Sequence, residues 1–159
     1  MGLKQAITPY LWFDTQAEEA ARFYVSVFPN SRILTVARYS ELGPGPEGSV
    51  MVVLFELDGM QFGAINGGTV FKLSEATSFL IDCKTQEEID FYWEKLGAGG
   101  LYQPCGWVKD RFGLSWQVNS SALVEKAHAD PATSRRVMEA MMQMTKIDLA
   151  VLQKAAEGA

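Results

Sequence analysis

The sequence predicts an α+β fold in which two related modules are followed by a helical tail. The main reason is an internal repeat at an offset of 68 residues, in which Asp14, Phe23, Tyr24 and Phe28 match Asp82, Phe91, Tyr92 and Leu96. In each copy an apolar strand precedes the aspartate and a helical pattern carries the aromatic pair. A fixed offset over four landmarks indicates a structural repeat. Two strand–helix copies predict a pseudo-symmetric sheet with a cleft between its halves, where we expect the function to lie.

The first module is predicted over residues 5–70. Its opening strand covers Ile7–Phe13, and Thr15 is placed to cap the following helix through a capping box. Three further strands are expected, over residues 32–39, 50–57 and 60–66. Asp58-Gly59 is typical of a hairpin turn between the last two. The predicted order is therefore strand, helix and three strands.

The second module is predicted over residues 74–120 and the helical tail over residues 121–159, within a single domain of residues 1–159. The module contains a strand, a helix, a short strand and a hairpin, over residues 77–83, 85–96, 101–104 and 106–119. In the tail, Asp130-Pro131 predicts a helix start. That helix is expected to reach Met144, and Asp148 is expected to cap a final one.

The composition argues against several classes of protein, including membrane-spanning and nucleic-acid-binding ones. No apolar run approaches the roughly 20 residues that span a bilayer, and the first residues lack the apolar core of a signal peptide. We therefore expect a cytoplasmic protein with no membrane partner. A net charge of −5 without a basic stripe argues against nucleic acid. Cys83 and Cys105 lack CxxC spacing, so both are expected to be free thiols.

The repeated strand–Asp, Phe-Tyr and apolar–Gly pattern resembles the vicinal oxygen chelate superfamily, which includes glyoxalase, bleomycin resistance and dioxygenase proteins. The first copy departs from it by Pro29 in place of glycine. Several stretches resemble its PhnB-like branch, which often carries the label 3-demethylubiquinone-9 3-methyltransferase: Leu11–Asp14, Phe28–Ser31, Phe55–Gly59, Asn66–Gly68, Gly106-Trp107, Trp116–Val118 and Met138–Ile147. The resemblance implies paired βαβββ modules of the glyoxalase/bleomycin resistance/dioxygenase type, sheets curved around a cleft, and a homodimer.

The resemblance also implies four metal-ligand positions, usually filled by histidine or glutamate. Here they fall on Thr8, Ala76, Gln117 and a position near Ala64 or Asn66. These residues supply weak neutral oxygens at most, whereas divalent transition metals prefer imidazole, thiolate or carboxylate. The single histidine, His128, belongs to the tail. We therefore expect no bound metal, unless other donors have taken over: Glu56, Asp82 or Cys105.

The methyltransferase label predicts S-adenosylmethionine as a cofactor. A nucleotide is usually held by a glycine-rich turn between a strand and a helix. The prolines in Gly43–Gly48 remove amide donors and no helix follows, while Gly97–Gly100 follows a helix. We therefore do not expect this cofactor.

Strand alternation assigns candidate ligand-facing residues. If Thr8 points inward, so do Tyr10 and Trp12, while Leu11 and Phe13 meet the helices. Glu56 interrupts an apolar strand; it is either a strand-end residue reaching solvent or a polar anchor or general base whose pKa is raised by burial. The aromatic candidates are either core or pocket residues. The candidate ligand-binding residues are Thr8, Tyr10, Trp12, Glu56, Asn66, Trp107 and Gln117.

No Ser–His–Asp set, Cys–His set or carboxylate pair emerges, so catalytic residues stay unassigned. The leading hypothesis is a metal-independent PhnB-like protein that binds a small planar or aromatic molecule in its cleft. One alternative is an enzyme, either the quinone methyltransferase of the label or a metal-dependent lyase or dioxygenase. The other is a resistance protein that sequesters a drug.

Overall fold

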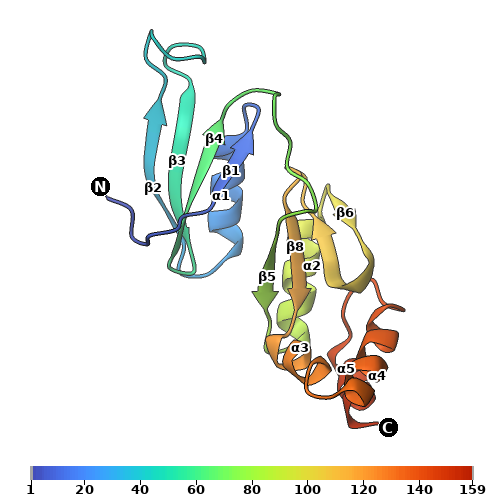
Figure 1. Ribbon diagram of the computed structural model, residues 1–159. Coiled ribbons are helices and arrows are strands. Elements are labelled where there is room, and N and C mark those ends of the chain that lie inside the picture. The colour runs from blue at the N-terminus through green and yellow to red at the C-terminus, as the bar shows by residue number, and fades with distance from the viewer. Residues whose placement is uncertain (1, 159) are drawn as a thin grey trace. The chain divides into compact units, whose positions relative to one another are not determined.

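The computed structural model describes residues 2–158, and the chain divides into two compact units between Leu73 and Ser74. The first unit has the order β1 (Tyr10–Phe13), α1 (Ala17–Val27), β2 (Arg32–Arg38), β3 (Val50–Leu57) and β4 (Met60–Asn66). Its sheet has the strand order β1-β4-β3-β2, with β1 parallel to β4 and the other pairs antiparallel. The predicted order of elements is confirmed, with α1 on one face of the sheet (Figure 1).

The core of the first unit lies between α1 and this sheet. Ala20 and Ala21 are fully buried, and their small side chains let the helix approach the strands closely. The ring of Tyr24 stacks on Phe55, which stacks in turn on Phe62. Burial of one such aromatic side chain contributes about 1.5–3 kcal/mol, so this row of rings fixes the helix on the sheet.

The start of α1 differs from the prediction. Gln16 is the N-cap residue and its side chain makes no capping bond, so the predicted cap at Thr15 is wrong. The Asn66 side chain takes that role, because its Oδ1 accepts a hydrogen bond of 2.8 Å from the Ala17 amide. A residue at the end of β4 thus supplies the acceptor that the local sequence lacks.

The second unit repeats the arrangement. Its elements are β5 (Ser78–Asp82), α2 (Gln86–Gly97), β6 (Leu101–Tyr102), the 3₁₀ turn η1 (Pro104–Gly106), β7 (Trp107–Lys109) and β8 (Ser115–Asn119). The strand order β5-β8-β7-β6 matches that of the first sheet. Thr85 caps α2 by accepting from the Glu88 amide. Buried Asp110 accepts from the Phe112 and Leu114 amides, which closes the predicted hairpin.

Three helices form the tail: α3 (Ser121–Ala127), α4 (Pro131–Met141) and α5 (Leu149–Glu157). They gather beyond the carboxyl end of β5 (Figure 1). Helix α4 ends at Met141, three residues before the predicted Met144, because the chain then turns to meet the sheet. The Cys105 and Gly106 amides donate to the carbonyls of Met144 and Thr145. These bonds attach the segment that follows α4 to the turn η1 before β7.

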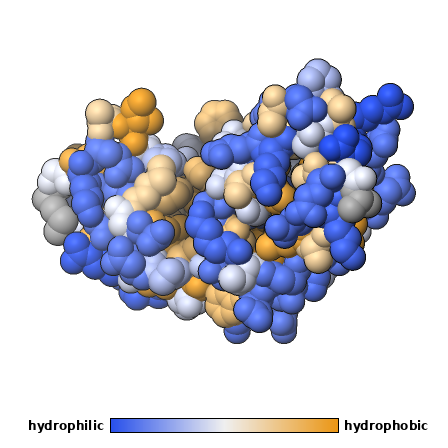
Figure 2. Space-filling model, turned by 90° about the horizontal axis from the view of Figure 1, so that it is seen from below, coloured by the Kyte–Doolittle hydropathy of each residue, from blue (hydrophilic) through white to orange (hydrophobic). Residues whose placement is uncertain are grey.

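The surface carries both polar and apolar side chains. The face seen in Figure 2 is mostly hydrophilic, with apolar residues in small groups among the charged ones. Several large apolar side chains are nevertheless at least 44% exposed, among them Ile7, Phe71, Leu80, Leu101 and Met142. Within residues 2–158, no helix has the length and apolar character needed to cross a bilayer.

Candidate functional site

One face of the first sheet is free of α1 and carries two of the predicted aromatic residues. Leu11 and Phe13 are each 4% exposed, whereas Tyr10 is 45% exposed and Trp12 is half-buried. The predicted division of β1 into a helix side and an open side is therefore confirmed. The Tyr10 ring lies over Gly63 of β4, where an added Cβ would come within 2.7 Å of the ring. Because glycine has no side chain, the Tyr10 ring can pack directly on the backbone of β4 at this position.

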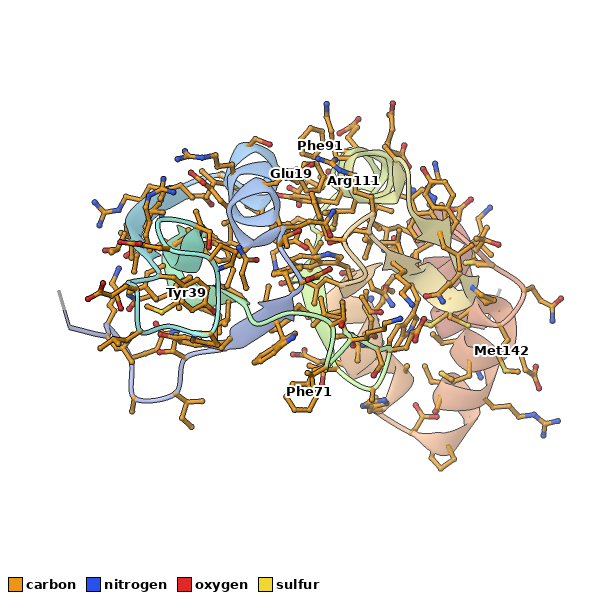
Figure 3. The ribbon with its side chains drawn as sticks, turned by 90° about the horizontal axis from the view of Figure 1, so that it is seen from above. Glu19, Tyr39, Phe71, Phe91, Arg111 and Met142 are labelled. Atoms are coloured by element: carbon orange, nitrogen blue, oxygen red, sulfur yellow. The ribbon has the colours of Figure 1, made fainter. Side chains whose placement is uncertain are left out.

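Trp12 holds the segment that follows β4 against the open face. Its indole Nε1 donates a 3.0 Å hydrogen bond to the Gly68 carbonyl, and its ring meets Phe71 edge to face at 4.9 Å. Phe71 is 62% exposed and points outward from the ribbon (Figure 3). Only glycine fits at position 67, since a Cβ there would lie 2.1 Å from the indole. Trp12 is thus partly a packing residue and partly exposed on the open face.

Glu56 forms ion pairs on this face. It is 7% exposed, and its carboxylate contacts Lys4 Nζ and Arg32 Nε, each at 3.2 Å. The hydrogen bond from Arg32, and then that from Lys4, lowers the pKa of Glu56 below its usual 4.5. The predicted direction for a general base, a pKa raised by burial, is therefore wrong, because the two cations outweigh desolvation. Glu56 stays ionised and ties three segments together.

Asn66 and Thr8 use their polar atoms within the fold. The Asn66 Nδ2 donates to the Val50 carbonyl at 3.1 Å, in addition to the bond at the start of α1. Thr8 precedes β1, so strand alternation does not set its direction, and its hydroxyl donates to the Gln5 carbonyl at 3.4 Å. Both side chains therefore take part in hydrogen bonds within the first unit.

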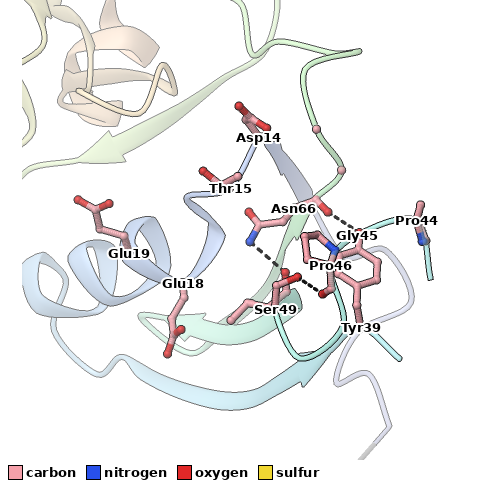
Figure 4. A pocket seen from close by; sticks show the side chains of 13 residues that line it. Asp14, Thr15, Glu18, Glu19, Tyr39, Pro44, Gly45, Pro46, Ser49 and Asn66 are labelled. Carbon is pink, nitrogen blue, oxygen red and sulfur yellow. Dashed lines mark hydrogen bonds between the residues drawn. The ribbon is translucent and has the colours of Figure 1, made fainter. Parts of the chain in front are cut away.

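A hollow of about 500 Å³ lies in the first unit between the start of α1, the β2–β3 loop and the end of β4 (Figure 4). Tyr39 holds the loop in place: its hydroxyl donates to the Asn66 carbonyl, and Gly43 and Gly45 pack on its ring. The carboxylate of Glu18, at the rim, pairs with Arg22 at 2.8 Å. Of the predicted ligand-binding residues, the hollow contains only Asn66.

The open face of the second sheet brings together Trp107 and Gln117, which lie opposite each other on β7 and β8. Both are half-buried, and the exposed side chain of Leu80 lies beside Gln117 on β5. The Gln117 amide donates through Nε2 to the Ser78 hydroxyl at 2.9 Å. An indole, an amide and an apolar side chain thus form a continuous surface, the combination typical of small-molecule sites.

Four polar residues that the sequence did not single out lie on the same face: Glu75, Gln103, Lys109 and Ser115. Lys109 Nζ contacts Glu75 Oε1 at 3.1 Å, and Gln103 Nε2 donates to the same oxygen at 3.4 Å. Hydrogen bonds lower the pKa of Glu75. The largest effect comes from its own backbone amide, and smaller effects come from Lys109 and then Gln103. Alternation from Gln117 and Trp107 points to Ser115 and Lys109, but the sequence carries no signal for Glu75.

The side chains that could hold a metal do not form a suitable set. Within residues 2–158, no three His, Cys, Asp or Glu residues are grouped as metal ligands. Asp82 is held by Lys84 Nζ and the Ser121 amide, which lower its pKa to about 2. Burial raises the pKa of the Cys83 thiol to about 12, which keeps it protonated. The donors at the positions implied by the resemblance, such as Thr8 and Gln117, do not fit a divalent transition metal.

Both units have the order strand, helix and three strands. Two such units make up the fold of the vicinal oxygen chelate superfamily, as predicted. Residues 5–119 match the family model described as 3-demethylubiquinone-9 3-methyltransferase, and the chain belongs to this PhnB-like family. The PhnB protein of Bacillus cereus is 38% identical, with a TM-score of 0.66 over 72% of this chain and 98% of that chain.

Two fosfomycin resistance proteins share the fold alone. FosX from Mesorhizobium loti is 15% identical, with a TM-score of 0.55 over 80% of this chain and 99% of that chain. FosX from Listeria monocytogenes, in complex with Mn(II) and sulfate, is 16% identical, with a TM-score of 0.50 over 74% of this chain and 92% of that chain. No protein with a curated function matches the chain significantly.

Proposed function

We propose that this protein binds a small planar organic molecule on the open, aromatic faces of its sheets, without a metal ion. The observation that carries the proposal is the second sheet, where α2 covers one face and the other presents Trp107 beside Gln117 and Leu80. An aromatic ring gains contact area on an indole, and a neutral amide orients it through hydrogen bonds. The Tyr10 ring, which packs on Gly63, gives the first sheet a similar aromatic surface.

The donor chemistry supports binding without a metal. Manganese accompanies FosX from Listeria monocytogenes, whereas the positions implied here hold Thr8, Ala76 and Gln117. The polar atoms of Thr8 and Gln117 take part in hydrogen bonds within the fold. The expected outcome is that dialysis against a chelator leaves both the melting temperature and ligand binding unchanged. Loss of either, restored by one metal ion, would contradict metal independence.

The binding face is tested with Trp107→Leu and the matched control Phe91→Leu. Phe91 is also an exposed aromatic residue of the second unit, but it lies on α2. We expect wild-type protein and Phe91→Leu to bind naphthalene derivatives, detected by ligand-observed NMR, and Trp107→Leu to bind them at least about tenfold more weakly, a loss of about 1.4 kcal/mol. Equal binding by all three proteins would exclude this face.

The family description favours a second candidate, methyl transfer from S-adenosylmethionine. The glycine-rich segment Gly43–Gly48 joins two strands and packs on Tyr39, so it does not form the usual strand–turn–helix cradle. A thermal shift assay separates the candidates. A true cofactor at 100 times its dissociation constant adds about 2.7 kcal/mol of stability, which visibly raises the melting temperature. The proposal of simple binding expects no such shift.

A further inference from the structure

The second sheet holds two buried polar atoms that lack partners. Within residues 2–158, the buried side-chain atoms without a hydrogen-bond partner are Gln103 Oε1 and Ser115 Oγ. Ser115 is fully buried and lies opposite Lys109 on the neighbouring strand. Gln103 lies on the other side of β7, where its backbone N–H donates to the Trp107 carbonyl at 2.9 Å. Buried polar atoms are nearly always paired, so two orphans flanking one strand point to a missing group.

Both atoms belong to the open face. Glu75 Oε1 receives hydrogen bonds from both Gln103 Nε2 and Lys109 Nζ, so these two side chains lie on the same side of the sheet. Lys109 and Ser115 are directly opposite each other in register, and therefore share a face. The orphan atoms consequently flank the strand that carries Trp107.

The orientation of Gln103 defines what the missing group must offer. An ionised carboxylate accepts hydrogen bonds but cannot donate them, so Glu75 requires the Nε2 end of the Gln103 amide to face it. The Oε1 end is then left as an acceptor. The Ser115 hydroxyl either donates or accepts. The missing group must therefore donate a hydrogen bond to Gln103.

The neighbouring charges disfavour an ionic group. Glu75 is held 3.1 Å from Lys109, so the two charges compensate each other. A ligand anion would compete with Glu75 for Lys109, and a cation would compete with Lys109 for Glu75, so either ion would have to displace a partner that is already in place. A neutral hydroxyl or amino group donates to Gln103 Oε1 without adding charge.

We propose that this face recognises a planar ligand by a neutral hydroxyl or amino group, which donates to Gln103 Oε1 while the ring lies against Trp107. The inference rests on the proposed function and names the ligand class for the same face.

Three probes of one shape test the ligand class: 2-naphthol, its methyl ether 2-methoxynaphthalene, and 2-naphthoate. We expect 2-naphthol to bind wild-type protein at least about tenfold more tightly than either of the others, since only it offers a neutral donor. Equal binding of all three would overturn the donor inference and leave the proposed planar-ligand function intact. Tightest binding of 2-naphthoate would also overturn the donor inference and leave the planar-ligand function intact. If none of the three probes binds, both the donor inference and the planar-ligand function are overturned.

Variants test the two atoms. Gln103→Met should abolish the preference for 2-naphthol, and Gln143→Met, at an exposed glutamine of the same unit, should keep it. Ser115→Ala should raise the melting temperature of the ligand-free protein, because it removes a buried hydroxyl without a partner. A preference kept in Gln103→Met would overturn the inference.

Discussion

Glu56 shows how partners, rather than burial, set the chemistry of a side chain. It lies in β3 with apolar neighbours, yet Lys4 and Arg32 approach it from two other segments. A buried carboxylate without such partners would have a raised pKa and could act as a base. With Lys4 and Arg32 as partners, Glu56 forms ion pairs and has a lowered pKa, so it is not a plausible proton acceptor.

Replacement of Glu56 by glutamine should flatten the dependence of stability on pH. Because folding lowers the pKa of Glu56 below 4.5, the ion pairs stabilise the fold above that value and lose this effect as the pH falls through the folded-state pKa. Urea unfolding at about pH 7 and about pH 3 measures the change. Wild-type protein should lose more stability between these two conditions than Glu56→Gln.

The matched control is Glu47→Gln, at an exposed position in the β2–β3 loop. Its pH dependence should follow that of wild-type protein. If Glu56→Gln and Glu47→Gln have the same profile, the ion pairs do not contribute measurably in solution.

At the scale of elements, one side chain of α2 fixes the start of α5. Gln86 Nε2 donates to the Ile147 carbonyl at 2.9 Å, and Gln86 Oε1 accepts from the Leu149 amide at 2.9 Å. Both ends of one amide are used, and they fix the segment that enters α5. The carboxyl end of α5 is held in turn by Arg136, which donates to the Ala155 and Ala156 carbonyls.

Gln86→Ala should loosen α5 and leave the sheet of the second unit folded. Removal of both hydrogen bonds should cost about 1–2 kcal/mol of stability. Amide hydrogen exchange should therefore speed up in α5 more than in β8. Gln153→Ala is the control, since Gln153 is exposed on α5 itself, and its exchange rates should match those of wild-type protein. Uniform acceleration across the second unit would instead mean that the tail and the sheet unfold together.

At the scale of the whole molecule, we propose that the chain forms a homodimer. Large apolar side chains are exposed in both units, including Phe71 at 62% in the first and Met142 at 65% in the second. Burial of such side chains against a second copy would remove apolar surface from water, which favours association. Light scattering coupled to gel filtration should give twice the mass of one chain. A single-chain mass at every concentration would refute the dimer.

The sequence predicted those features that depend on neighbours along the chain. The 68-residue repeat predicted the first strand and helix of both units, local strand and turn patterns predicted the strands that follow, and alternation predicted the covered face of β1, where Leu11 and Phe13 are buried. The Asp110 hairpin and the Asp148 cap of α5 were also correct. Each of these follows from local hydrogen bonding or from the period of one element.

Tertiary structure alone decided the partners of the polar side chains. Asn66 caps α1 from 49 residues away, Arg32 reaches Glu56 across 24 residues, and Glu75 meets Lys109 across 34. Such pairs depend on strand register and on how a connecting segment crosses a sheet, which no local pattern encodes. For this reason the sequence determined the family and the open face of β1, whereas the packed structure determined which buried polar atoms lack a partner.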